Sequence, residues 1–137
     1  MTVIVCVDDK MGVLFNSRRQ SKDSVLRERV LELSKDTMLW MSPYTQKQFE
    51  ENDQSNICVA DNFLVVAENN AFCFCEGTAL SPCIDKIDRI ILYKWNRVYP
   101  SDETFDVDLS NWSLESSFEF QGSSHEKITE EVYVHNA

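Results

Sequence analysis

Apolar runs and amphipathic stretches alternate along the first two thirds of the chain. Residues 3–7 form a short apolar run that ends at an Asp-Asp pair, a pattern typical of a strand buried on both faces of a sheet. Over residues 22–33, leucine and valine recur at positions i, i+4 and i+7, which predicts an amphipathic helix with Ser21 as its N-cap. Further strands are predicted over residues 37–41, 57–60, 71–76 and 89–95.

Two serine–proline pairs mark the starts of further helical segments. Proline at the first helical position has no N–H to lose, so the pair at Ser42 predicts a helix that runs to residue 50 or 51. The pair at Ser81 predicts a short helical turn in the same way. Residues 51–56 are polar and predict a loop, whereas residues 61–70 fit either a helix or a strand.

The last third of the chain changes to a period of two. Apolar and polar residues alternate from Trp112 to Phe120, Gly122 predicts a turn, and residues 128–134 alternate again. This pattern predicts an antiparallel pair of strands at the C-terminus. Together with the earlier strand and helix alternation, it predicts an α/β protein with a mixed sheet, formed as a single domain over residues 1–137.

Charge and hydropathy narrow the range of partners. The formal net charge of −10 disfavours nucleic-acid binding, because phosphate neutralisation needs a basic face. The sequence has no apolar run of about 18 residues and no secretory signal, so we expect no membrane span and a cytoplasmic location. A homodimer is left open.

The five cysteines predict reduced thiols in an apolar interior rather than a metal site. Alternation places Cys73 and Cys75 on one face of a strand, and Cys83 follows them. No CxxC pair is present, and the two histidines, His125 and His135, both lie near the C-terminus. We therefore expect no zinc site.

The polar segment over residues 15–23 is the main candidate for a binding site. Its Arg18 or Arg19 could hold a carboxylate or a phosphate through paired N–H donors, with Asn16 beside them. Asp23 could bind an amidine-like ring edge or move a proton. The alternative is a solvated loop that leads into a helix, with Asp23 placed to favour the helix dipole.

Two other polar clusters have simpler interpretations. Trp95, Asn96 and Arg97 follow the strongest strand, where ligands gather in α/β sheets, but packing at a strand end is the favoured interpretation. The Ser-Ser-His-Glu run at residues 123–126 predicts a turn. A serine and a histidine so close together in a hairpin cannot form a hydrolase triad with each other.

The order of these elements resembles dihydrofolate reductase. The opening Val-Ile-Val-Cys-Val-Asp and the following Gly12 resemble the first strand and loop of that family. Leu39-Trp40-Met41 followed by Thr45 resembles its second strand and next helix, and the run from Ile90 through Tyr93, Asp102, Phe105 and Trp112 resembles its penultimate strand and the loop after it. The resemblance covers nearly the whole chain and implies a dihydrofolate reductase-like fold.

The same resemblance implies roles for particular residues. Asp23 falls where the family places its catalytic carboxylate, and Tyr93 joins Asn16, Arg18 and Arg19 as a substrate-binding residue. Tyr44 and Thr45 fall where the family contacts the phosphates of its cofactor.

Departures from the family pattern change the expected chemistry. The chain has only three glycines, and Cys75-Glu76 stands where the family has a Gly-Gly pair close to NADPH. Arg18-Arg19-Gln20 replaces a Leu-Pro-Trp segment, and no basic residue precedes the helix threonine. We therefore expect a protein that binds a small molecule without NADPH-dependent folate reduction and without a cofactor. A divergent NADPH-dependent reductase and a partner-binding protein are the alternatives.

The chain is also similar to a family of short bacterial proteins that often carry the name ribonuclease Z. The similarity lies in Phe-Asn-x-Arg-Arg-Gln-Ser at residues 15–21 and Tyr-x-Trp-Asn-Arg at residues 93–97. That name implies a dinuclear zinc hydrolase with a His-x-His-x-Asp-His motif, which this sequence lacks. Two histidines cannot build such a site, so we do not expect zinc-dependent ribonuclease activity.

Overall fold

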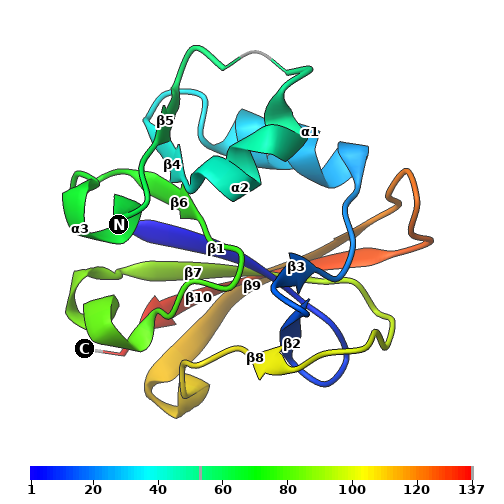
Figure 1. Cartoon of the computed structure of the whole chain (residues 1–137). Coiled ribbons are helices and arrows are strands. Elements are labelled where there is room, and N and C mark those ends of the chain that lie inside the picture. The colour runs from blue at the N-terminus through cyan, green and yellow to red at the C-terminus, as the bar shows by residue number, and fades with distance from the viewer. Residues whose placement is uncertain (53, 137) are drawn as a thin grey trace.

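A seven-stranded mixed sheet forms the centre of the molecule, in a computed structural model that describes residues 1–52 and 54–136. The strand order is β5-β4-β6-β1-β7-β10-β9, and β10 runs in the opposite direction to the other six strands (Figure 1). The predicted α/β class and the C-terminal antiparallel pair are confirmed. The strands are β1 (Thr2–Val7), β4 (Leu39–Met41), β5 (Ile57–Val59), β6 (Phe72–Phe74), β7 (Arg89–Lys94), β9 (Trp112–Phe120) and β10 (Ile128–His135).

Short helices cover both faces of this sheet. The longest is α1 (Ser24–Leu33), and Asp23 caps it, not Ser21 as predicted. The segment predicted from Ser42 divides into α2 (Pro43–Gln46) and a 3₁₀ turn, η1 (Lys47–Phe49). No helix in the described part of the chain is long and apolar enough to cross a membrane. The remaining helical turns are α3 (Phe63–Val66), η2 (Ser81–Lys86) and η3 (Leu109–Asn111).

Alternation along the strands divides the apolar residues between two cores. In β7, Ile90 and Leu92 face the core on the α3 side, whereas Ile91 and Tyr93 face the core beneath α1 and η1. Cys73 and Cys75 lie buried on the α3 side, so the predicted shared face is confirmed, and all five cysteines are free thiols. The loop predicted over residues 51–56 includes Asp53, which lies outside the described residues.

A second, three-stranded sheet lies across the carboxyl ends of the main parallel strands (Figure 1). It consists of β2 (Gly12–Phe15), β3 (Arg18–Arg19) and β8 (Glu103–Thr104). The sequence prediction assigned these residues to loops, because strands of two to four residues carry too little periodicity to detect. A tight turn at Asn16 and Ser17, both with positive φ (51° and 60°), joins β2 to β3. This hairpin places Arg18 and Arg19 over the edge of the main sheet.

We predict that Ser17→Gly stabilises the fold. A non-glycine residue at φ 60° is strained, and glycine relieves that strain at a turn of this type. The free energy of unfolding, measured by urea denaturation, should rise by about 0.5–1 kcal/mol. Ser116→Gly in the exposed strand β9 is the matched control and should lower it by a similar amount. Equal destabilisation by both changes would contradict the turn geometry.

Candidate functional site

The candidate site lies at the carboxyl ends of β1, β6 and β7, where an α/β sheet normally binds its ligands (Figure 1). Three segments distant in the sequence meet there. They are the β3–α1 connection, the chain that follows β7, and the loop between β9 and β10. Side chains from these segments form one buried hydrogen-bonded cluster. Beside it, Arg19 of β3 and Glu76, which follows β6, form an ion pair.

Asp23 holds the first of these clusters together. One of its carboxylate oxygens caps α1 by accepting hydrogen bonds from the amides of Val25 (2.9 Å) and Leu26 (3.3 Å). The carboxylate also accepts from the amides of Ser123 and Ser124, both at 2.9 Å, in the loop between β9 and β10. The side chain of Asp23 is completely buried, so its carboxylate oxygens accept hydrogen bonds from groups of this chain and not from a ligand in solution.

This arrangement explains why residue 122 is a glycine. A Cβ at that position would collide with the Asp23 carboxylate. The backbone of the loop can approach the carboxylate only because residue 122 has no side chain.

These hydrogen bonds also keep Asp23 charged. Burial opposes ionisation, but hydrogen bonds from His125 and from the amides of Ser124, Ser123 and Leu26 hold the pKa of the Asp23 carboxyl well below its usual range. The site therefore contains a fixed, buried negative charge next to an imidazole.

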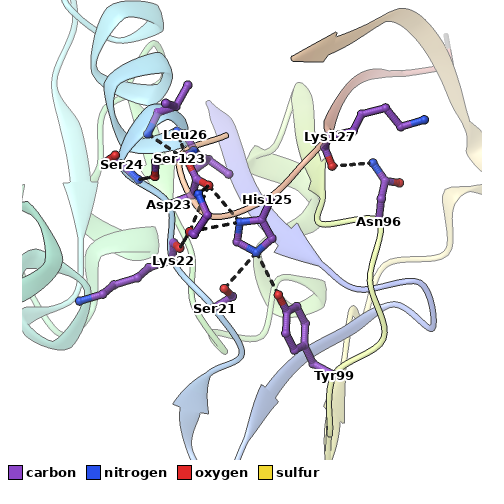
Figure 2. Close-up of polar contacts among 12 residues, drawn as sticks. Ser21, Lys22, Asp23, Ser24, Leu26, Asn96, Tyr99, Ser123, His125 and Lys127 are labelled. Atoms are coloured by element: carbon purple, nitrogen blue, oxygen red, sulfur yellow. Dashed lines mark hydrogen bonds and ion pairs between the residues drawn. The ribbon is translucent and has the colours of Figure 1, made fainter. Parts of the chain in front are cut away.

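His125 occupies the centre of the cluster, with its side chain 1% exposed (Figure 2). Its Nδ1 lies 2.9 Å from Asp23 Oδ2, and its Nε2 lies 3.1 Å from Ser21 Oγ and 2.9 Å from Tyr99 Oη. The ring stacks on Trp95 with centroids 4.4 Å apart. A neutral imidazole that donates Nδ1–H to the carboxylate presents its Nε2 lone pair to the two hydroxyls.

This constellation was not predicted from the sequence. The predicted connection between the two C-terminal strands is present, but the local pattern around His125 points only to the serines next to it. Its partners Asp23 and Ser21 lie 102 and 104 residues away in the sequence. No spacing pattern connects such distant residues, and only the fold brings them together.

Arg19 belongs to a second polar cluster. Its guanidinium forms a bidentate ion pair with Glu76 at 2.8 and 3.0 Å and lies over the Tyr44 ring, 4.3 Å from the centroid. Its backbone N–H donates to the Tyr44 hydroxyl. Burial opposes the charge, but the bond to the Glu76 carboxylate raises the pKa of the Arg19 guanidinium. Arg19 is thus held rigidly by residues of this chain.

Open grooves flank β3 on both sides. Arg18 is exposed and Lys22 is exposed, and neither side chain has a hydrogen-bond or ion-pair partner among residues 1–52 and 54–136. The first groove has a volume of ≈ 570 Å³ and is lined by Arg18, Arg19, Ser21, Lys22 and Tyr44. The second has a volume of ≈ 490 Å³ and is lined by Phe15, Asn16, Arg18, Arg19, Gln20, Tyr99 and Pro100.

The structure places two of the candidate ligand-binding residues away from these grooves. Tyr93 is fully buried, and its hydroxyl donates to Glu130 at 2.7 Å, while Arg29 holds the same carboxylate from the other side. Thr45 is also fully buried, with its amide and hydroxyl bonded to Ser42. Asn16, Arg18, Arg19 and Tyr44 do come together around the grooves.

The described residues contain no group of three or more His, Cys, Asp or Glu side chains that could hold a metal ion. Trp95 is buried in the core beneath α1, whereas Arg97 is exposed.

Comparisons with known proteins support the fold alone. No protein-family model matches the sequence, and no curated protein matches it either. Among solved structures, the chain is similar to dihydrofolate reductase from Enterococcus faecalis, which was solved in complex with NADP(H) and RAB-propyl. The TM-score is 0.71 at 10% sequence identity, and the similarity covers 99% of this chain and 96% of that chain. The fold is therefore dihydrofolate reductase-like, and no comparison supports the ribonuclease Z name.

We predict that Asp23→Asn destabilises the protein in a pH-dependent manner. The variant keeps one acceptor oxygen where the carboxylate serves several donors, so the free energy of unfolding should fall by about 2–4 kcal/mol at pH 7. Because the folded-state pKa is depressed, this contribution is present above about pH 4 and is lost as the pH falls further.

Urea denaturation at pH 7 and at pH 3 checks this prediction. The difference between the wild type and Asp23→Asn should shrink at the lower pH. Asp61→Asn, a change at an exposed carboxylate, is the control and should cost little at either pH. A constant difference across this range would show that Asp23 does not contribute through its charge.

Proposed function

We propose that this protein binds a small anionic molecule in the grooves beside β3, without NADPH-dependent folate reduction. The observation that carries the proposal is the pair of free cationic side chains, Arg18 and Lys22, in the groove that Arg19 and Tyr44 also line. Both lie at the carboxyl edge of the sheet. A carboxylate or phosphate is the natural partner of such side chains.

The charge distribution supports the proposal. The chain has a formal net charge of −10, so its general surface repels anions. A local concentration of cations on such a surface selects where an anion can approach. The Arg19–Glu76 pair neutralises itself and fixes the groove wall, which leaves Arg18 and Lys22 to supply the positive charge.

A divergent reductase is the second candidate, since the Enterococcus faecalis enzyme of similar fold was solved with NADP(H). The residues of this chain do not fit that cofactor in the manner the resemblance implies. Thr45 is fully buried and its backbone N–H already donates to Ser42 Oγ, so neither its N–H nor its side chain is accessible to a phosphate at the surface. Glu76 adds a carboxylate to the end of β6, where close approach of a pyrophosphate would require backbone N–H groups. We derive no step through NADPH.

Titration with inorganic pyrophosphate, citrate and NADPH, followed by tryptophan fluorescence, tests the proposal. Trp95 borders the same wall as Arg19 and Ser21 and provides the signal. We expect saturable binding of at least one of the two simple anions. Arg18→Gln and Lys22→Gln should each weaken it about tenfold, because each removes one charge-assisted contact.

Arg97→Gln is the matched control, since Arg97 is an exposed arginine that lines neither groove, and its affinity should equal that of the wild type. Micromolar NADPH binding that is unaffected by Arg18→Gln would favour the reductase instead. No saturable response to any of the three probes would favour a partner-binding protein.

A further inference from the structure

The hydrogen bonds around His125 have the connectivity of a nucleophilic triad. Ser21 Oγ lies 3.1 Å from His125 Nε2, and His125 Nδ1 lies 2.9 Å from Asp23 Oδ2 (Figure 2). We propose that Ser21 is a nucleophile, with His125 as its general base, and that the protein hydrolyses small esters. That the preferred ester carries an anionic group rests on the proposed function, whereas the nucleophile itself does not.

The base is held in one orientation. Asp23 and His125 are both almost completely buried, so water does not compete for the bond between them. Stacking on Trp95 fixes the plane of the imidazole, with an interplanar angle of 22°. The remaining acceptors of Asp23 are occupied by backbone amides of α1 and of the β9–β10 loop. Asp23 is thus a positioning residue that directs Nε2 toward Ser21.

Of Ser21, His125 and Asp23, Ser21 is the residue that reaches a groove. Ser21 is partly exposed and lines the groove of ≈ 570 Å³ together with Arg18, Lys22 and Tyr44. Within the described part of the chain, no residue accepts a hydrogen bond from the backbone N–H of Lys22, next to the nucleophile. That N–H and the two free cations are the groups available to stabilise an oxyanion.

The reaction needs only the ester and water. Ser21 Oγ forms a bond to the carbonyl carbon while its proton passes to His125 Nε2. The bond from that carbon to the leaving oxygen then breaks, and Nε2–H gives its proton to the departing alcohol. Water attacks the acyl-serine, its proton passes to Nε2, and the acid leaves as Ser21 Oγ regains that proton.

Tyr99 modulates this arrangement. Its hydroxyl lies 2.9 Å from the same Nε2 and competes with Ser21 for the lone pair. Removal of that hydroxyl leaves Ser21 as the one partner of Nε2 among residues 1–52 and 54–136. Tyr99→Phe should therefore raise the rate of reaction at Ser21 several-fold, an effect that a purely structural cluster would not produce.

Active-site labelling tests the nucleophile directly. The purified full chain is treated with phenylmethylsulfonyl fluoride, a small neutral reagent, and the adduct is located by peptide mass spectrometry. We expect one adduct, on Ser21, whose rate of formation rises with pH as a single group loses its proton. Ser21→Ala should abolish the adduct, whereas Ser116→Ala, at an exposed strand serine, should leave it unchanged.

Variants of the base extend the test to turnover of p-nitrophenyl acetate. His125→Gln and Asp23→Asn, assayed where circular dichroism shows them folded, should lower kcat/KM by at least about 10²-fold. The labelling of the wild-type protein tests the nucleophile even if these variants fail to fold. The proposal is overturned if Ser21 stays unlabelled in the wild type, or if its rate of labelling equals that in the urea-unfolded chain.

A second ester separates the two proposals. The anionic mono-4-nitrophenyl ester of succinate should exceed p-nitrophenyl acetate in kcat/KM about tenfold, and Arg18→Gln should remove that preference. Labelling of Ser21 without any preference for the anionic ester would retain the nucleophile and overturn the anionic specificity. Anion binding without labelling of Ser21 would support the proposed anion site and overturn the nucleophile.

Discussion

The rest of the site depends on the hydrogen bonds that the buried carboxylate of Asp23 accepts. This carboxylate caps the start of α1, anchors the loop between β9 and β10 and orients His125, all through one side chain. These bonds share one carboxylate, so loss of its charge would weaken all of them together. The absence of a side chain at Gly122 is a direct consequence, because the loop must lie against the carboxylate.

The dihydrofolate reductase-like fold is thus combined with an unusual set of groups at its sheet edge. Arg19 and Glu76 occupy the end of β6 and neutralise each other, while Tyr44 supports the arginine from below. A pair of this kind adds little net charge but defines a rigid wall. The charges that remain available to a ligand belong to Arg18 and Lys22, at the rim of that wall.

The main sheet could be predicted from the sequence because its signals are local. Apolar runs located β1 and β7, alternation located β9 and β10, and the serine–proline pairs located α2 and η2. The second sheet could not, because its strands are too short to show a period and its turn uses Asn16 and Ser17 without a glycine. Asn16, Arg18 and Arg19 were predicted from the run of polar residues at positions 15–23, and Tyr44 was predicted from the resemblance to dihydrofolate reductase. The partnership of Ser21 with His125 depends on contacts that no local pattern encodes.

The distance along the chain between these partners also bears on how the site forms. Asp23 must wait for residues 123–125, which are synthesised about a hundred residues later, before its acceptors are satisfied. Until β9 and β10 join the sheet, the Asp23 carboxylate lacks the loop amides and His125 as partners. Contacts of such high sequence separation form late and slow the search for the native state. The cluster around Asp23 is therefore complete only after β9 and β10 have joined the sheet, and its formation marks the closure of the two ends of the chain on one another.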